Sequence, residues 1–326
     1  MSRPMKGPAA LIVTVLAVLA CETASAQDDG PRAYWKGMSG TNVVGFQYLP
    51  MNAVIVSDAF DPAHYMYPQS DITMNLVLVN YSRHGTLFGR AASFSAFLMG
   101  GNLDVEFFAP GTGGKQASHG FGDPSVQVAV NLVGASSLPS FYHMSKYEPK
   151  VSLDIALLGA VPIGKYSESS AVNMGLNRWW GRVALPFTYY LGPYVPGYRS
   201  SVEVVPSVFL FAPNNNFVGS ELKNDPLYQI EAHVTRDFTA HFFASVDFLY
   251  RHGARSTIDG TQAGESIDLV QAGFTLDWAV SENAGVRFSY QPIVAGGTDM
   301  DGDMVRMMSW FGWHALVENV KKLGGG

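Results

Sequence analysis

The sequence predicts an all-β protein, a transmembrane antiparallel up-and-down β-barrel of about twelve strands and of the outer-membrane type. Three observations lead to this fold class. Only 15% of the 326 residues are charged while 47% are hydrophobic, and 34 Gly with 18 Pro argue against a bundle of long apolar helices. Apolar and polar residues alternate with a period of two, and the connections between the alternating segments are short and long in turn.

Residues 1–26 are predicted to be a signal peptide. Arg3 and Lys6 precede an apolar run over 9–20, and small residues at 24–26 stand where a signal peptidase cleaves. The run is shorter than the roughly 20 residues that a membrane-spanning helix needs. Lipidation at Cys21 is the alternative. Since Cys21 is the single cysteine, cleavage after residue 26 leaves a mature chain without thiolate metal sites or disulfides.

The mature chain is divided into three parts. Residues 27–41 are expected to form an N-terminal periplasmic or plug segment, with Tyr34, Trp35 and Met38 as its large apolar residues. Residues 42–317 form the barrel, and residues 318–326 are a C-terminal tail. Twelve strands are expected within the barrel, at 42–50, 70–81, 86–99, 121–134, 148–160, 178–191, 199–211, 225–236, 239–251, 266–279, 283–294 and 304–317.

Alternation is clearest over residues 228–235, where every second side chain is apolar and the others are polar. On a strand, this pattern places apolar side chains on one face and polar side chains on the other, so the two faces are expected to meet different solvents. The apolar face is expected to meet lipid and the polar face the barrel lumen. In the segment over 71–78, the side chains expected toward lipid are Ile72, Met74, Leu76 and Leu78, and those expected toward the lumen are Asp71, Thr73 and Asn75.

The connections support a membrane barrel over a soluble β-sandwich. With both termini in the periplasm, the short turns fall on the periplasmic side and the long loops outside, except that residues 135–147 are too long for a turn and are expected to be an ordered periplasmic segment. The polar faces carry Ser, Thr, Gln and Asn with few Lys or Glu, whereas a solvated sandwich face usually carries more charge.

Particular residues then point to a known family. Residues 161–166 and the run Asn173-Met174-Gly175-Leu176-Asn177-Arg178-Trp179 are followed by Asn216-Phe217 and by 225–228, while Phe121-Gly122-Asp123-Pro124 precedes them. This arrangement resembles the outer-membrane family named for the meta-pathway of phenol degradation, over about residues 40–314. The resemblance implies an outer-membrane barrel that passes small hydrophobic or aromatic solutes by facilitated diffusion. It supplies no catalytic or ligand-binding residues.

Two departures from the family pattern concern the ends of the barrel. Arg251, His252 and Arg255 place positive charge where paired glycine is usual, and are expected at the outer mouth. The C-terminus lacks a terminal aromatic residue, so the last strand is expected to end near Trp313. The expected neighbours are outer-membrane lipids and lipopolysaccharide, and the expected state is a monomer.

No motif for a cofactor, a metal or catalysis is convincing. Residues 109–116 look like a phosphate loop but have Ala109 where Gly is required and Gln116 where Ser or Thr holds magnesium. Residues 299–303 imitate the start of a calcium loop, but Trp310 replaces the bidentate Glu, which leaves weak divalent binding beside lipopolysaccharide as the alternative. A net charge of −6 argues against a nucleic-acid partner. We therefore expect no cofactor and no enzymatic activity.

The charged residues of the polar faces are the candidate site. If the alternation holds, they brace the lumen, line a solute path, or do both. The candidates are Arg182, Glu203, Glu231, His233, His241, Asp247, Arg287 and Arg306. Two other functions remain open: a lipid-modifying enzyme built around His241, Ser245 and Asp247, and a structural or adhesion barrel without transport.

Overall fold

A computed structural model describes residues 29–56, 69–108, 114–263, 266–296 and 300–314. The expected signal peptide and the C-terminal tail lie outside these residues. Within the described residues, no helix has the length and apolar character needed to cross a membrane.

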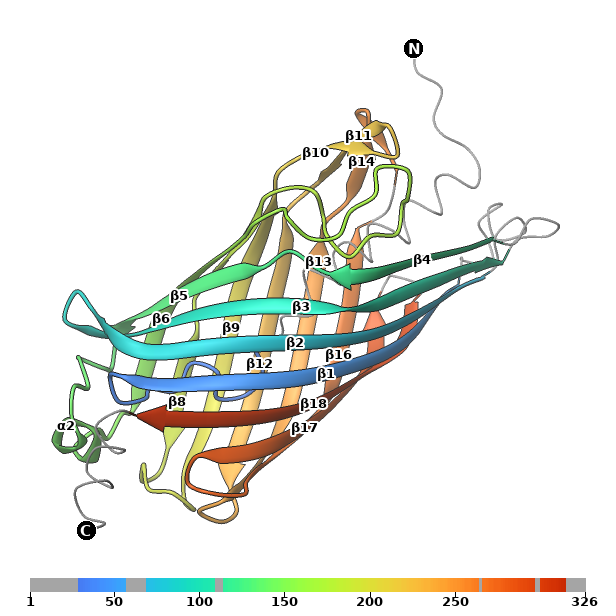
Figure 1. The fold of residues 1–326 in the computed structure, drawn as a ribbon. Helices are drawn as coiled ribbons and strands as arrows, with labels where there is room; N and C mark the ends of the chain where they lie inside the picture. The colour runs from blue at the N-terminus through green and yellow to red at the C-terminus, as the bar shows by residue number, and fades with distance from the viewer. Residues whose placement is uncertain (1–28, 57–68, 109–113, 264–265, 297–299, 315–326) are drawn as a thin grey trace, which may run out of the picture.

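The described chain forms a closed antiparallel barrel of twelve strands, which confirms the predicted fold class (Figure 1). Neighbouring strands follow one another along the chain, and pairing of the first strand with the last closes the barrel. The strands are β1 (Thr41–Val56), β2 (Gln69–Leu87), β3 (Arg90–Phe108), β5 (Ser125–Val133), β6 (Val151–Ala160), β7 (Trp180–Ala184) with β8 (Phe187–Leu191), β9 (Ser200–Phe211), β12 (Leu227–Asp237), β13 (Phe242–Gly253), β16 (Ile267–Ala279), β17 (Ala284–Gly296) and β18 (Met300–His314).

The sixth strand is broken into β7 and β8 at Pro186. Both pieces pair with β6 on one side and with β9 on the other, so they occupy one position in the barrel. Proline has no N–H to donate and therefore interrupts the ladder of a central strand. The neighbours keep their bonds around the break, since Asp154 N donates to Pro186 O and Leu185 N donates to Pro206 O.

The connections divide the barrel into a turn end and a loop end. The turn end carries the short connections β2–β3, β8–β9, β12–β13 and β16–β17, together with residues 134–150, which contain the helix α2 (Phe141–Ser145). The loop end carries the long connections, including β4 (Gly114–Phe121), which extends the barrel wall beside β3. A small sheet also lies there (Figure 1), made of β10 (Asn214–Phe217), β11 (Ser220–Asn224), β14 (Ser256–Ile258) and β15 (Thr261–Gln262).

The outer face of the barrel is apolar and its inner face is polar along most strands. On β5, for example, Val126 is exposed while Gln127 and Asn131 are buried in the interior. One expectation about the faces is wrong. On β2 the apolar residues Ile72, Met74, Leu76 and Leu78 are buried inside, whereas Asp71, Thr73 and Asn75 are on the outer face.

The reason for the reversal is strand length. A membrane-spanning strand needs about 9–11 residues, whereas β2 and β3 have 19 each. The loop-end half of β2 therefore extends beyond the hydrocarbon thickness, where its outer face meets water. Its inner face packs into an apolar core that fills the loop end of the barrel.

That core is built from strands and loops together. Its strand residues include Leu103, Trp180, Phe209, Leu227 and Leu269. The connection 161–179 adds Val172, Met174 and Leu176, and the small sheet adds Phe217, Leu222 and Ile258. The described part of the loop end is thus filled by an apolar core, and the polar part of the interior lies toward the turn end.

Candidate functional site

Residues 29–40, here called the inner segment, run inside the barrel from the middle of the lumen to the turn end. Asp29 bonds to Arg182 on β7, near mid-barrel, with 2.6 Å between Oδ2 and Nη2. At the other end of the segment, Ser39 N donates to the carbonyl of Leu138, and Gly40 N donates to the carbonyl of His84. The segment therefore occupies the polar half of the interior.

Buried ion pairs attach the inner segment to three parts of the wall. Besides the bond of Asp29, Arg32 Nη1 lies 2.5 Å from Asp237 Oδ1 on β12. Lys36 Nζ lies 2.7 Å from Asp154 Oδ1 on β6, and the side chains of both pairs are nearly inaccessible to solvent. Removing one partner of such a pair leaves a buried charge and costs about 3–5 kcal/mol.

Aromatic residues add to this attachment. The guanidinium of Arg32 lies 4.1 Å from the ring centre of Trp35 and 3.9 Å from that of Phe243. Trp35 Nε1 also donates to Glu203 Oε1 at 2.9 Å, and Arg32 N donates to Glu203 Oε2 at 2.8 Å. Glu203 thus holds the backbone and a ring of the segment at one point of β9.

We expect Lys36→Met to loosen the inner segment. Asp154 would keep its bonds from Ser152 and Asn131 but lose its cation. In planar bilayers, the frequency of current openings should rise severalfold. Lys146→Met is the matched control, since Lys146 is exposed, directly follows α2 and donates to Tyr142 Oη in that helix. Equal opening frequencies for the two variants would contradict the role assigned to the Lys36 pair.

Seven of the eight predicted lumen residues are inside the barrel. Arg182, Glu203, Glu231, His233, Asp247 and Arg306 are buried, and Arg287 is partly buried. His241 differs from its expectation, because β13 begins at Phe242 rather than at residue 239 and leaves His241 exposed in the preceding turn, beside a turn-end cavity.

The three residues expected at the outer mouth separate. Arg251 is buried in the lumen, where its Nε donates to Gln229 Oε1 at 2.8 Å. His252, the next residue, is on the outer face, with its Nδ1 3.9 Å from Asp268 Oδ1. Arg255 is at the loop end, with its Nε 3.7 Å from Asp225 Oδ2. Strand alternation explains the opposite directions of the first two.

The residues named for a lipid-modifying enzyme do not form a nucleophile and base. His241 is exposed in the turn before β13, whereas Ser245 and Asp247 are buried on β13. Ser245 Oγ donates to Asp247 Oδ1 at 2.7 Å, and a different histidine, His233, shares that oxygen through Nδ1 at 2.7 Å. A hydrolase needs its hydroxyl bonded to the imidazole, with the acid on the far ring nitrogen. Across the part of the chain that the structure describes, no three His, Cys, Asp or Glu side chains gather as metal ligands.

A cavity of about 320 Å³ lies inside the barrel beside the inner segment, and we call it the inner cavity. Its walls come from the inner segment and from β1–β3, β5, β17 and β18. The wall mixes polar, aromatic, aliphatic and charged side chains. Its hydroxyls and amides are Gln47, Asn80, Ser82, Ser93, Ser95 and Gln127, its rings are Tyr34, His84, Phe97 and Trp310, its aliphatic side chains are Ala33, Val43, Leu78 and Met308, and its charged groups are Asp29, Arg32, Arg287 and Arg306. Arg287 also lines the turn-end cavity of about 250 Å³.

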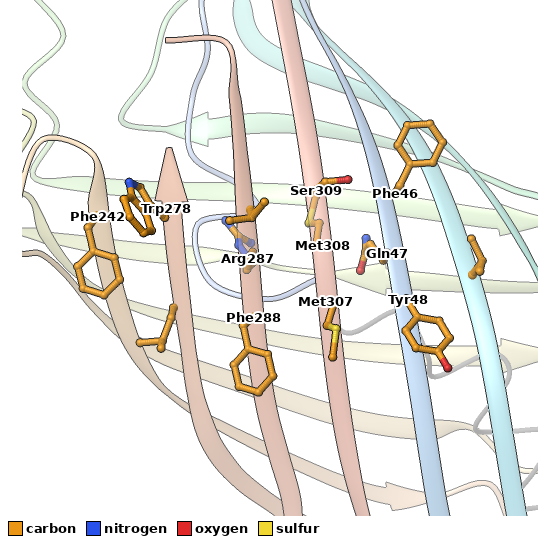
Figure 2. Close-up of a pocket in the computed structure, with 13 residues that line it drawn as sticks. Phe46, Gln47, Tyr48, Phe242, Trp278, Arg287, Phe288, Met307, Met308 and Ser309 are labelled. Carbon is orange, nitrogen blue, oxygen red and sulfur yellow. The ribbon is translucent and has the colours of Figure 1, made fainter. Parts of the chain in front are cut away.

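A different pocket, of about 680 Å³, lies on the outer face (Figure 2). The rings of Phe46, Tyr48, Trp278 and Phe288 project from β1, β16 and β17 around it. Most of its lining is apolar side chains from the outer faces of the strands, and Gln47, Arg287 and Ser309 lie between them. Gln47 and Arg287 also line the inner cavity.

The family-like residues fold over the loop end. Asp123 binds the connection 161–179 at two points, since Gly164 N donates to its Oδ1 at 2.9 Å and Leu176 N donates to its Oδ2 at 2.8 Å. Burial raises the pKa of the Asp123 carboxyl, although these two donors oppose the shift. Asn214 joins the small sheet to the same connection through Tyr166 Oη and the carbonyl of Leu176.

Several residues of the site were not predicted. Asp29, Arg32 and Lys36 supply the charges of the inner segment, and Asp237 supplies a partner. The signal present in the sequence was the density of charge in 28–36, just before the first strand, which a merely flexible linker does not need. Their partners on the wall could not be predicted from the sequence, because the contacts join residues that are 118, 153 and 205 positions apart in the chain.

Comparisons with known proteins agree with this architecture. A family model described as "Putative MetA-pathway of phenol degradation" matches residues 65–298, which confirms the resemblance. An outer membrane channel from Pseudomonas putida F1 is 14% identical with a TM-score of 0.68, and the alignment covers 86% of this chain and 98% of that one. The transport unit of the autotransporter AIDA-I from Escherichia coli is 7% identical with a TM-score of 0.55, covering 95% and 100%. The comparison with curated proteins gives no match.

Proposed function

This chain belongs to the family of the MetA-pathway of phenol degradation, and from that premise we propose that it is an outer-membrane channel for small hydrophobic or aromatic compounds. Transport is passive facilitated diffusion through the interior of the barrel. No energy source or cofactor takes part. The observation that carries the proposal is the inner cavity, which lies within a closed barrel and is lined by both rings and polar groups.

The turn end faces the periplasm and the loop end faces outward. Outer-membrane barrels have short periplasmic turns and longer external loops, and the connections of this barrel differ in length in that way. The predicted signal peptide provides export. Solute would then meet the apolar core at the loop end first, and the inner segment last.

Two regions of the barrel interior control the passage of a solute. The apolar core of the loop end favours partition of a ring out of water, because burial of apolar surface is favourable. The inner segment narrows the polar half that follows. A barrel of twelve strands is between the filled eight-stranded and the open sixteen-stranded kinds, so a segment of this size is enough to restrict it.

The proposal is tested by solute flux into proteoliposomes. Swelling is measured for phenol, toluene, arabinose and a larger sugar, and the rate of protein-free liposomes is subtracted because small aromatics also cross lipid. We expect a protein-dependent rate for the single-ring compounds that exceeds that for arabinose. No protein-dependent flux of any solute would overturn the proposal, and fatty-acid release from the phospholipid would support an enzyme instead.

A further inference from the structure

We propose that Trp310 is the gate of a solute path that runs past the inner segment, from the inner cavity to the turn-end cavity, while the segment stays docked. This inference rests on the proposed function and deepens it, because it names the route through the polar half of the barrel and the side chain that closes this route.

The two cavities adjoin each other. The inner cavity has a volume of about 320 Å³ and the turn-end cavity one of about 250 Å³, and both are lined by Arg32, Arg287 and Trp310. The turn-end cavity also reaches His241, which is exposed in the turn before β13. A cavity of about 150 Å³ already holds benzene. Each cavity is therefore large enough for one aromatic ring, and the three shared side chains form the boundary between the cavities.

This boundary lies between the inner segment and the barrel wall. Arg32 belongs to the segment, whereas Arg287 is on β17 and Trp310 is on the neighbouring strand β18. A solute that crosses the boundary therefore passes along the wall. The ion pairs that attach the segment to β6, β7 and β12 do not have to break for this passage.

Two of the three boundary residues are fixed. The guanidinium of Arg32 is paired with the buried carboxylate of Asp237. Arg287 Nε donates to Asp277 Oδ2 at 2.8 Å, and Arg287 Nη1 donates to the carbonyl of Pro31 at 3.2 Å. Neither guanidinium can move away without leaving a carboxylate unpaired, and such a loss is costly where water is scarce.

Trp310 is the boundary residue that is able to move. Among the described residues, no hydrogen bond, ion pair or ring contact involves its indole. Its register partners on the two neighbouring strands are both glycines, Gly285 on β17 and Gly45 on β1. The ring rests over Gly285, since a Cβ atom placed there would be 2.5 Å from Trp310 Cζ2. The indole is thus held by packing alone.

The side of Trp310 toward β1 offers the space for this movement. A Cβ atom placed on Gly45 would meet the amide oxygen of Asn80 and Met308 Cε, which are both ends of side chains. Methionine is unbranched and adapts readily to a change in its surroundings. The indole can therefore turn from Gly285 toward Gly45 when Met308 moves aside, and this turn joins the two cavities.

The gate is tested with Trp310→Phe, which makes the ring smaller, and Trp310→Ala, which removes it. Ion current is measured in planar bilayers, and swelling of proteoliposomes is measured with phenol and arabinose after subtraction of the protein-free rate. We expect the conductance and the protein-dependent rates to rise from the unchanged protein to Trp310→Phe and further to Trp310→Ala, at least threefold for the latter.

Trypsin distinguishes a path past the inner segment from release of the segment. Lys36 is buried while the segment is docked, so cleavage after Lys36 reports undocking. We expect this cleavage to be no faster in Trp310→Ala than in the unchanged protein. Faster cleavage would overturn the inference, because the added current would then come from release of the segment.

Trp278→Ala is the matched control. Trp278 is on the outer face of β16 and is 60% exposed, so its loss should leave the conductance and the flux unchanged (Figure 2). Equal conductance of Trp310→Ala and Trp278→Ala would overturn the inference. Heat-modifiable migration in gels shows which variants are folded, and Trp310→Phe decides if Trp310→Ala is not.

The outcome can be separated from that of the proposed function. Protein-dependent flux of phenol and toluene that is the same in the unchanged protein and in Trp310→Ala would leave the channel and remove the gate. A larger ion current through Trp310→Ala without flux of any aromatic solute would leave the gate and remove the channel for aromatic compounds.

Discussion

Deletion of residues 29–38 is expected to raise the single-channel conductance about five- to tenfold, because it takes the inner segment out of the polar half of a twelve-stranded barrel. The segment has three ion pairs with the wall, and its rings pack against β8 and the following turn, where Trp35 lies 5.5 Å from the rings of Tyr190 and Tyr194. The measurement is ion current through purified protein in planar bilayers. The variant keeps Ser39 and Gly40, so their bonds to the carbonyls of Leu138 and His84 remain, while the bond from Thr41 N to Met38 O is lost.

Two controls exclude misfolding and separate the effects of attachment and of volume on the conductance. Retained heat-modifiable migration in gels shows that the barrel is still folded. A variant in which residues 29–38 are replaced by a Gly-Ser chain of equal length separates the loss of attachment from the loss of volume, and should lie between the two. A conductance unchanged by the deletion would mean that the inner segment does not restrict the pore.

Gly164→Ala is expected to release the connection 161–179 from the loop end. A Cβ atom at this position would be 2.7 Å from the carbonyl carbon of Gly122 and 2.8 Å from the nitrogen of Asp123. Both are backbone atoms that cannot turn away as a side chain can. Overpacking costs about 1–3 kcal/mol in ordinary cores, and here it also pushes apart the bonds of Asp123 to Gly164 and Leu176.

Trypsin provides the readout, since Lys165 follows directly and is reached once the connection opens. Cleavage there should accelerate at least tenfold in reconstituted protein, because an opening made 1.4 kcal/mol easier is about tenfold more populated. Gly159→Ala is the control, since a Cβ at Gly159 on β6 meets nothing within 4 Å. Similar cleavage rates for the two variants would show that the contact at Gly164 does not hold the connection.

The barrel itself could be predicted from the sequence, because strand alternation and turn spacing are local signals. Each of the twelve expected ranges lies mainly over one strand of the barrel, with the sixth split at Pro186. Which side chains of β2 point into the barrel could not be predicted in the same way. Alternation says that Leu76 and Asn75 point in opposite directions, but it does not say which of them meets lipid.

The candidate site was predictable only in part. The inward direction of Glu231, His233 and Asp247 follows from alternation within single strands. Their partners on other strands do not, because the contact of His233 with Asp247 is set by the register between β12 and β13, and that of Glu231 with Arg182 by the closure of the barrel. Trp35 was expected in that segment from its size, whereas the roles of Arg32 and Lys36 appear only when Asp237 and Asp154 are brought beside them.

The inner segment is synthesised before the strands, but we expect it to dock after the barrel wall has formed. Its residues precede every strand in the chain, yet its acidic partners Asp154 and Asp237 follow Lys36 and Arg32 by 118 and 205 residues. Contacts of such separation form slowly, after most of the chain is present. Lys36 and Arg32 must therefore remain hydrated until the wall has curled around them. Docking of the segment is a final step rather than a nucleus, so the rate of barrel folding should not depend on it.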